Sequence, residues 1–198
     1  MGICMGLAIV MQIITLHAPP IQFNVASVTP TVARDCGDLP VHAVSNKRSR
    51  NATQTASWFV PPNIRICSYT NITTTRIRKA VSFWEKLGYE FGDIHMASRD
   101  DYQCIISTPN LNEIMINIPD QDFKFGTHLG TTHIWHHTKT KEIEQAKIQI
   151  VDEWGTRERI LEHEIGHALG WKDNNISGHL MNKSWTGGGW NTTGLKNE

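Results

Sequence analysis

The chain has 198 residues, a formal net charge of +0 and 39% hydrophobic residues. This length suits one domain with an N-terminal appendage, and the apolar content is enough for a buried core. The balanced charge gives no basis for binding nucleic acid or an anionic membrane surface, so neither is expected as a partner.

The chain begins with an almost wholly apolar stretch, residues 2–16. A stretch this short and this close to the start is typical of a secretory signal rather than of a membrane span. Cleavage is expected after Ser27, with Ala18 as the other candidate. We therefore predict that residues 1–27 are a signal peptide, that the protein is secreted and that it has no stable membrane partner once the signal is removed. An uncleaved N-terminal membrane anchor is the alternative.

Residues 28–57 form an irregular, pro-like segment rich in Pro, Ser, Thr and Asn. Its basic run, residues 47–50, is either a solvated loop or a processing site. Cys36 lies within Arg34-Asp35-Cys36-Gly37-Asp38. Because a thiolate is a good zinc ligand, Cys36 could cap a metal ion and keep an enzyme latent. The alternative is that Cys36 is in a disulfide or is free.

Three of the 4 cysteines, Cys36, Cys67 and Cys104, follow the predicted signal. An odd number in an exported protein indicates one disulfide and one remaining thiol. Cys67 and Cys104 both lie in predicted strands, so this pair is favoured.

The compact domain is expected to span residues 58–198. Alternating or continuous apolar residues predict five strands, at residues 63–67, 103–107, 114–118, 131–137 and 146–151. A first helix follows the capping residues Thr73 to Thr75 and stops at Gly88. A second begins near Thr156 and buries Leu161, Ile165, Ala168 and Leu169. The order of elements predicts an α+β fold with one helix backing the sheet.

The second helix carries His163, Glu164 and His167 in a His-Glu-x-x-His pattern. On a helix the two histidines lie one turn apart on one face, so both can bind one metal ion. Glu164 lies about 100° away around the helix, where it can take a proton from a water molecule at the metal instead of serving as a ligand.

Zinc in hydrolases commonly has three protein ligands, so a third residue is needed. Gly170 allows a sharp turn after the helix, and Asp173 follows three residues later. Asp173 is therefore the expected third ligand. The alternative third ligands are Asp152, Glu153 and His179.

The pattern His163-Glu164-x-x-His167-x-x-Gly170-x-x-Asp173 resembles the signature of the metzincin metallopeptidases, in which the last residue is usually His. Snapalysin-type bacterial peptidases are similar in having Asp there. Metzincins also carry a methionine in a tight turn beneath the metal. Met181 lies eight residues after Asp173, a spacing similar to that of the matrix metalloproteinases. The run around Cys36 also resembles their latency segment, although the match is short.

This resemblance implies a metzincin-like catalytic domain: a twisted, mostly parallel sheet with an edge strand, a backing helix, an active-site helix and a small C-terminal subdomain after Gly170. The sequence departs from the family in two ways. Asp173 adds a negative charge to the site, and Lys183 stands where some metzincins have a tyrosine that assists the transition state.

The resulting hypothesis is a monomeric zinc (Zn²⁺) endopeptidase that acts on protein or peptide substrates, with Glu164 as general base. An extended substrate is expected to add a strand to the sheet edge at residues 131–137. Two other functions remain open: a non-catalytic, zinc-stabilised binding module and an amidase acting on cell-wall peptides. His133, His136 and His137 are either edge-strand histidines near the site or a second metal site.

Overall fold

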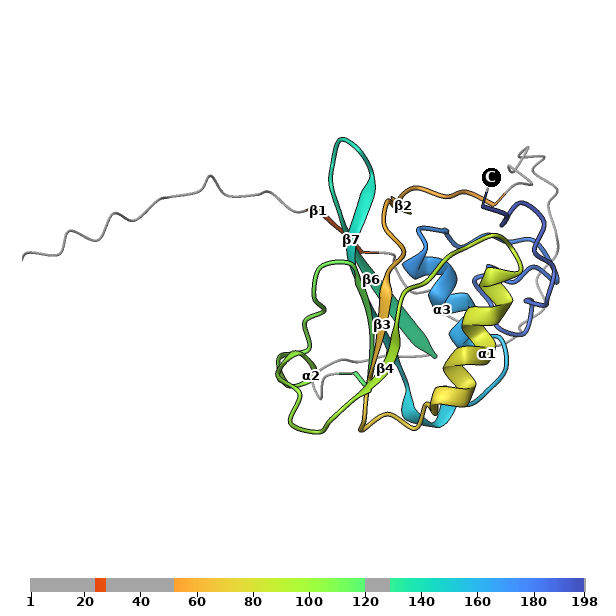
Figure 1. Cartoon of the computed structure of the whole chain (residues 1–198). Helices are drawn as coiled ribbons and strands as arrows, with labels where there is room; N and C mark the ends of the chain where they lie inside the picture. The colour runs from red at the N-terminus through yellow and green to blue at the C-terminus, as the bar shows by residue number, and fades with distance from the viewer. Residues whose placement is uncertain (1–23, 28–51, 120–128, 198) are drawn as a thin grey trace, which may run out of the picture.

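The computed structural model describes residues 24–27, 52–119 and 129–197 (Figure 1). The predicted signal stretch at residues 2–16, Cys36 and the basic run at residues 47–50 lie outside the described residues. Within the described part, no helix combines the length and the apolar character needed to cross a membrane.

A single seven-stranded sheet forms the centre of the fold, in the order β1-β6-β7-β5-β3-β4, with β2 paired to β7. The strands β2, β3, β4, β5 and β7 pair in parallel, whereas β6 runs antiparallel to β7 and β1 antiparallel to β6. The bounds are β1 Asn24–Ser27, β2 Ser57–Trp58, β3 Asn63–Cys67, β4 Ile94–Ala97, β5 Glu113–Asn117, β6 Gly130–His136 and β7 Glu142–Ile150. The prediction of an α+β fold with a mostly parallel sheet is confirmed.

Two helices cover one face of this sheet, α1 (Thr74–Glu85) and α3 (Ile160–Ala168). Figure 1 shows the short α2 (Tyr102–Ile106) on the opposite side, and a 3-10 turn, η1 (Asp152–Trp154), links β7 to α3. After α3 the described chain forms no further helix or strand. It folds back on itself through backbone hydrogen bonds such as the one from Asn174 N to Met181 O, at 2.8 Å.

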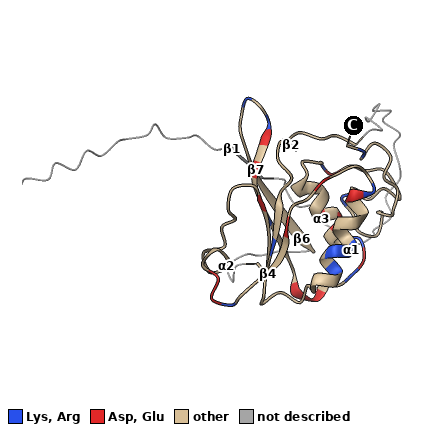
Figure 2. Ribbon diagram, in the orientation of Figure 1, with Lys and Arg blue, Asp and Glu red and all other residues tan. Residues whose placement is uncertain are grey.

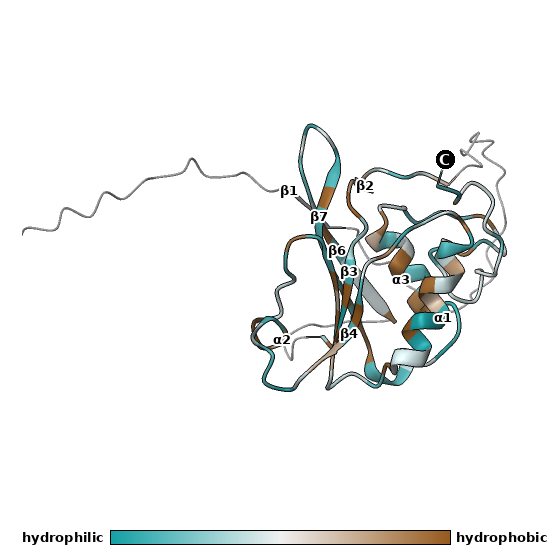
Figure 3. Cartoon of the chain, in the orientation of Figure 1, coloured by the Kyte–Doolittle hydropathy of each residue, from teal (hydrophilic) through white to brown (hydrophobic). Residues whose placement is uncertain are grey.

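The apolar core lies between the sheet and these two helices. Strand residues alternate toward it, so the isoleucines of β3, β5 and β7 meet the apolar faces of α1 and α3, and Figure 3 shows this in brown. Charged residues are instead found on the outward surface of α1 and at the tip of the β6–β7 hairpin (Figure 2). The fully buried members with the largest side chains are Trp84, Ile64, Ile66, Ile77, Ile114, Ile116, Ile143, Ile148, Ile150, Leu161 and Ile165. Met115 is also fully buried but belongs to a second cluster with Cys67, Ala97 and Cys104.

The helix α1 forms as its sequence predicts. The Thr73 side chain caps it by accepting a hydrogen bond from the backbone N–H of Arg76, at 3.1 Å. Gly88, with φ of +92°, follows its C-terminal end. The buried Trp84 donates its indole N–H to the carbonyl of Glu162 at 2.9 Å, which ties α1 to α3. Trp84 is therefore a core residue.

Three sequence expectations about secondary structure are wrong. Residues 103–107 belong to α2 and not to a strand, because the Asp101 side chain caps a helical turn by accepting from Cys104 N at 3.1 Å. The helix α3 is capped at Arg159 rather than near Thr156, since Arg159 adopts φ of +71°, which a helix interior excludes. The strand β6 is not the outermost strand, because β1 pairs with its residues His133 to His136.

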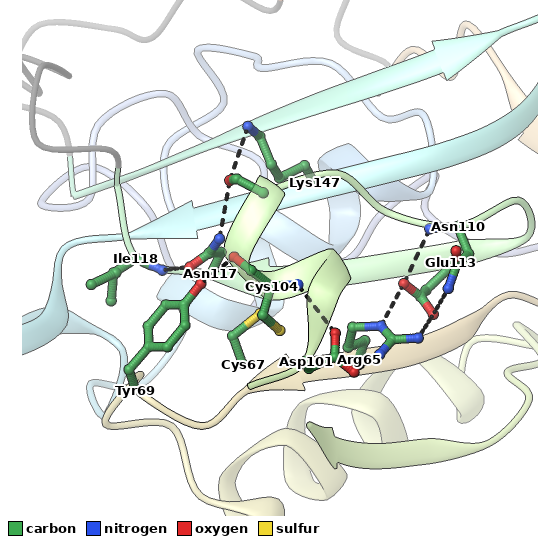
Figure 4. Close-up of a disulfide and its surroundings, with 11 residues drawn as sticks. Arg65, Cys67, Tyr69, Asp101, Cys104, Asn110, Glu113, Asn117, Ile118 and Lys147 are labelled. Atoms are coloured by element: carbon green, nitrogen blue, oxygen red, sulfur yellow. Dashed lines mark hydrogen bonds and ion pairs between the residues drawn. A yellow bond between two sulfur atoms is a disulfide. The ribbon is translucent and has the colours of Figure 1, made fainter. Parts of the chain in front are cut away.

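The disulfide between Cys67 and Cys104 is present, as predicted, and fixes α2 to the end of β3 (Figure 4). Arg65 forms a second link across the same face of the sheet. Its guanidinium donates to both carboxylate oxygens of Glu113, at 2.9 and 3.0 Å, and also pairs with Asp101. These contacts hold the segment around α2 on the face opposite α3.

Candidate metal centre

The helix α3 places the rings of His163 and His167 on one side. Each Nδ1 lies beside a backbone carbonyl, His163 with Leu180 O at 2.8 Å and His167 with Trp171 O at 2.7 Å. A carbonyl only accepts, so each Nδ1 carries the hydrogen and both Nε2 atoms face the site. The two Nε2 atoms are 3.1 Å apart. Two imidazole donors are thus oriented toward one point.

Asp173 reaches the same point because the chain reverses after α3. Gly170 has φ of +91°, and a side chain there would collide with the backbone of Ala56, so this position requires glycine. Asp173 Oδ1 lies 3.3 Å from the Nε2 of His163 and 3.4 Å from that of His167. The donor atoms of the three residues all lie within 4.8 Å of one another.

These separations match a tetrahedral metal site. Metal–ligand bonds of about 2.0–2.2 Å place two ligand atoms of a tetrahedron roughly 3.3–3.5 Å apart. The observed separations are 3.1, 3.3 and 3.4 Å. His163, His167 and Asp173 could therefore hold one metal ion, and three ligands leave a fourth position for water or substrate.

Without a metal ion, His167 and Asp173 form a largely buried pair of charges. Burial alone would disfavour the charged His167 ring, but hydrogen bonding and charge from Asp173, with the charge of Glu164, raise its pKa to about 9. Burial opposes ionisation of Asp173 too, yet hydrogen bonds from His163 and His167 hold its pKa well below the ordinary value. The carboxylate is thus ionised, and a metal ion competes with a proton for His167.

Glu164 is not one of these donors and contacts β6 instead. Its Oε2 accepts a hydrogen bond of 2.6 Å from the hydroxyl of Thr132, which is itself buried. Its Oε1 lies against Gly130, where a Cβ atom would be only 2.8 Å away. The start of β6 thus fixes the orientation of the Glu164 carboxylate. Glu164 directly follows the first histidine, His163.

Met181 lies under α3, fully buried, with its sulfur against Gly166. A side chain at Gly166 would collide with Met181 and would lie 2.8 Å from the Trp84 ring. The methionine therefore contacts the backbone of the helix turn that joins the two histidines.

His179, an alternative third ligand, serves another purpose. Its Nδ1 accepts from the backbone N–H of Met181 at 3.0 Å and lies 2.9 Å from the Asn174 amide, while Nε2 lies 3.1 Å from Thr193 O. Both ring nitrogens are thus engaged within the C-terminal segment. Burial lowers the pKa of this ring, which suits a neutral structural histidine.

The remaining alternatives also lie apart from the metal-binding group. Asp152 Oδ1 accepts from Asn71 N at 3.0 Å, and Glu153 is exposed. Across residues 24–27, 52–119 and 129–197, His163, His167 and Asp173 are the one set of three or more potential ligands that converges. The three histidines of the β6 region, His133, His136 and His137, therefore form no second site of this kind there.

Several contributors to the site were not identified from the sequence. Thr132 and Gly130 position Glu164, and the carbonyls of Leu180 and Trp171 orient the histidine rings. The sequence weakly indicates that Thr132 is buried, because it shares a strand face with Ile134 in the predicted strand. It gives no such indication for the carbonyls, since every residue has one.

A scan of the chain against models of protein families gives no match, and a search of curated proteins gives no significant relative.

Proposed function

We propose that the protein is a secreted, zinc-dependent endopeptidase of the metzincin type. One observation carries the proposal: a buried carboxylate, Glu164, is held by β6 beside a group of two histidines and one aspartate that could hold a metal ion. A helix with this arrangement is typical of zinc hydrolases. The Cys67–Cys104 disulfide supports an extracellular location.

Zinc suits the donor set, because it accepts imidazole nitrogen and carboxylate oxygen in tetrahedral sites. His163, His167 and Asp173 would be its ligands. When bound, zinc would supply a Lewis acid that polarises the scissile carbonyl and makes water a better nucleophile at neutral pH. Asp173 in place of a third histidine adds a negative charge, which moderates that effect.

Glu164 is the proposed general base. Its Oε2 is occupied by the Thr132 hydroxyl, so Oε1 is the oxygen that takes a proton from the attacking water. The same oxygen would then deliver that proton to the leaving amine. Burial of the carboxylate between α3 and β6 restricts its motion, which favours proton transfer along one direction.

An extended peptide would add to the edge of the sheet beside β6, antiparallel to it. The pairing of β1 with His133 to His136 supports the idea that this edge accepts an antiparallel strand. In the uncleaved chain a substrate would compete with β1 for part of the edge, and removal of residues 1–27 with the predicted signal would free it. The residues of β6 next to Glu164, Gly130 to Thr132, precede the stretch paired with β1.

Met181 is proposed to support the site from below without binding the metal. It packs against Gly166 between the two histidines, so it fixes the distance between that turn of α3 and the C-terminal segment. The backbone hydrogen bond from Asn174 N to Met181 O, at 2.8 Å, couples the same residue to the segment that carries Asp173.

Two matched substitutions test the proposal. Glu164→Gln keeps size and hydrogen bonding but removes the base, so zinc content should stay near one per chain while casein cleavage falls by about 100-fold or more. Asp173→Ala should instead lose zinc during dialysis, and activity with it. If Glu164→Gln cleaved casein like the parent protein, the peptidase assignment would fail.

The same experiment separates the two alternatives. A zinc-stabilised binding module would lose thermal stability on chelation and yet cleave nothing. A cell-wall amidase would release amines from peptidoglycan fragments while leaving casein intact, and Glu164→Gln would abolish that release.

A further inference from the structure

Two arginine–tryptophan pairs form one cluster at the start of α3. The guanidinium of Arg157 lies over the ring of Trp154, 4.1 Å from its centroid, and that of Arg159 lies over Trp185 at 5.0 Å. The two tryptophan rings meet edge to face, with centroids 6.1 Å apart. We call these four residues the arginine–tryptophan cluster.

One part of the cluster is linked along the chain to the metal-binding group. Arg159 caps α3, and its carbonyl accepts from His163 N at 2.8 Å, so it lies one turn before the first histidine. Its Nη1 donates to Trp185 O at 3.3 Å. The loop after Trp185 is joined through Gly189 N to His179 O, at 3.3 Å, next to the carbonyl that binds the His163 ring. Arg159 and His163 therefore contact the same short stretch of chain.

The other part of the cluster is linked through the β7–α3 connection to the strand that holds the general base. Trp154 ends the turn that follows β7, where Val151 N donates to Leu129 O at 3.1 Å. The next residue, Gly130, touches the Glu164 carboxylate. Short hydrogen-bonded segments thus link the cluster to the ligand His163 and to the base Glu164.

The positive charge of the cluster is not neutralised in the described part of the chain. Two nearby acids are paired elsewhere: Glu162 with Arg76 at 2.7 Å, and Glu158 with Lys79 at 3.2 Å. Neither Arg157 nor Arg159 has a carboxylate within 4.0 Å among the described residues. Two cations on exposed or half-buried rings, with Trp185 38% exposed, can therefore meet a ligand from solvent.

We infer that the arginine–tryptophan cluster binds an acidic side chain of the substrate close to the bond that is cleaved. A guanidinium presents two parallel N–H donors that match a carboxylate, and stacking on a tryptophan face keeps its plane fixed. The tryptophan faces also give the methylene groups of Glu or Asp an apolar surface. Arg159 is the specificity-determining residue, since it lies one helical turn before the ligand His163. This inference rests on the proposed peptidase function.

The test uses the zinc-loaded full chain and a set of fluorogenic peptides. Each peptide carries Glu at one position within three residues of the cleaved bond, and its partner carries Gln there. The parent protein should prefer one Glu peptide over its Gln partner by about tenfold in kcat/KM, an effect of the size expected for a charge-assisted hydrogen bond. Raising the salt concentration should reduce this preference.

Arg159→Gln should remove the preference by lowering kcat/KM for the Glu peptide, with little change for the Gln peptide. Arg159→Lys should keep part of it, because the charge remains while the planar fork is lost. Arg78→Gln, on the exposed side of α1, is the matched control and should leave both rates unchanged. Zinc content and thermal unfolding check that each variant is folded. If Arg159→Gln does not fold, the comparison of Arg159→Lys with the parent protein tests the inference.

The outcomes distinguish the two proposals. If the parent protein binds zinc but cleaves no peptide of the set and no casein, the peptidase function fails. If it cleaves Glu and Gln peptides equally, or if the Arg159 variants lower both rates by the same factor, the cluster is a structural stack and the inference is overturned.

Discussion

The Thr132 hydroxyl donates a 2.6 Å hydrogen bond to Oε2 of Glu164 and thereby joins strand β6 to the helix that carries both histidines. The two residues are 32 positions apart in sequence. Thr132 is only 2% exposed, so water cannot replace its hydroxyl. The orientation of the proposed base is thus set by the sheet as well as by the helix.

Replacing Thr132 by Val should lower kcat by about tenfold with little change in zinc content. Valine keeps the volume and removes the hydroxyl, so the carboxylate loses its orienting partner and becomes less well aligned for proton transfer. Thr132→Ser retains the hydroxyl and should keep most of the activity. Peptide hydrolysis and bound zinc, measured on both variants, test this expectation. Equal activity of the Val and Ser variants would contradict it.

Zinc binding at pH 7 should release about one proton from His167. The pKa of this ring in the metal-free protein is raised to about 9, so the ring is charged at pH 7 and must lose its proton to become a ligand. Zinc affinity should therefore rise with pH up to about 9 and level off above it, as far as His167 contributes. Calorimetric titrations in two buffers of different ionisation enthalpy measure the number of protons released. Release that does not decrease between pH 7 and about pH 10 would contradict this assignment.

The same raised pKa affects the stability of the metal-free fold. Because the folded-state pKa lies above the ordinary value of 6.5, the contribution of His167 is fully present below about pH 6.5 and is lost as the pH rises through about 9. Urea unfolding of the metal-free protein across this range should therefore show that the free energy of unfolding falls as the pH rises.

Gly166→Ala should destabilise the protein by about 1–3 kcal/mol, because the added methyl group collides with Met181 and with the Trp84 ring. Met181→Ala alone should cost about 2–5 kcal/mol by leaving a cavity. If the two residues touch as described, the double variant should be more stable than the sum of the single losses predicts. Urea unfolding of the four proteins gives this coupling, and strict additivity would exclude the contact.

Removing the Cys67–Cys104 disulfide should cost about 3–4 kcal/mol, the chain-entropy value for a sequence separation of 37 residues. The disulfide lies on the face of the sheet opposite α3. A Cys67→Ser, Cys104→Ser variant should therefore unfold at lower temperature while its folded state still binds zinc with unchanged affinity. Loss of zinc affinity in the folded variant would show that the two faces are coupled.

A protein that lacks residues 1–27 should bind peptide substrates with lower KM than the full chain. These residues include β1, which pairs with His133 to His136 on the edge of β6 where the substrate is proposed to bind. Removing a competing strand frees backbone donors and acceptors without altering the metal ligands. Peptide kinetics on the two chain lengths test this, with kcat expected to change less than KM. Equal KM values would place the substrate away from this edge.

The sequence by itself predicted the parts of the site that depend on short spacing. His163 and His167 share a helix face because their separation of four residues is close to one turn, and Gly170 signals the reversal that returns Asp173. The α1 helix was predicted for a similarly local reason, the period of its apolar residues. The Cys67–Cys104 pair was favoured because both residues were expected in strands, and the disulfide is present although Cys104 lies in α2.

Tertiary structure decided what depends on residues far apart in the chain. Three features come from segments whose sequences do not indicate the contacts they make. They are the partners of Glu164, the carbonyls that orient the two histidine rings, and the strand that pairs with β6. The apolar run at residues 103–107 became a helix because Asp101 caps its first turn, which periodicity over five residues cannot distinguish from a strand. Local patterns fix φ and ψ over a few residues, whereas the position of one carboxylate depends on how the helix and sheet pack.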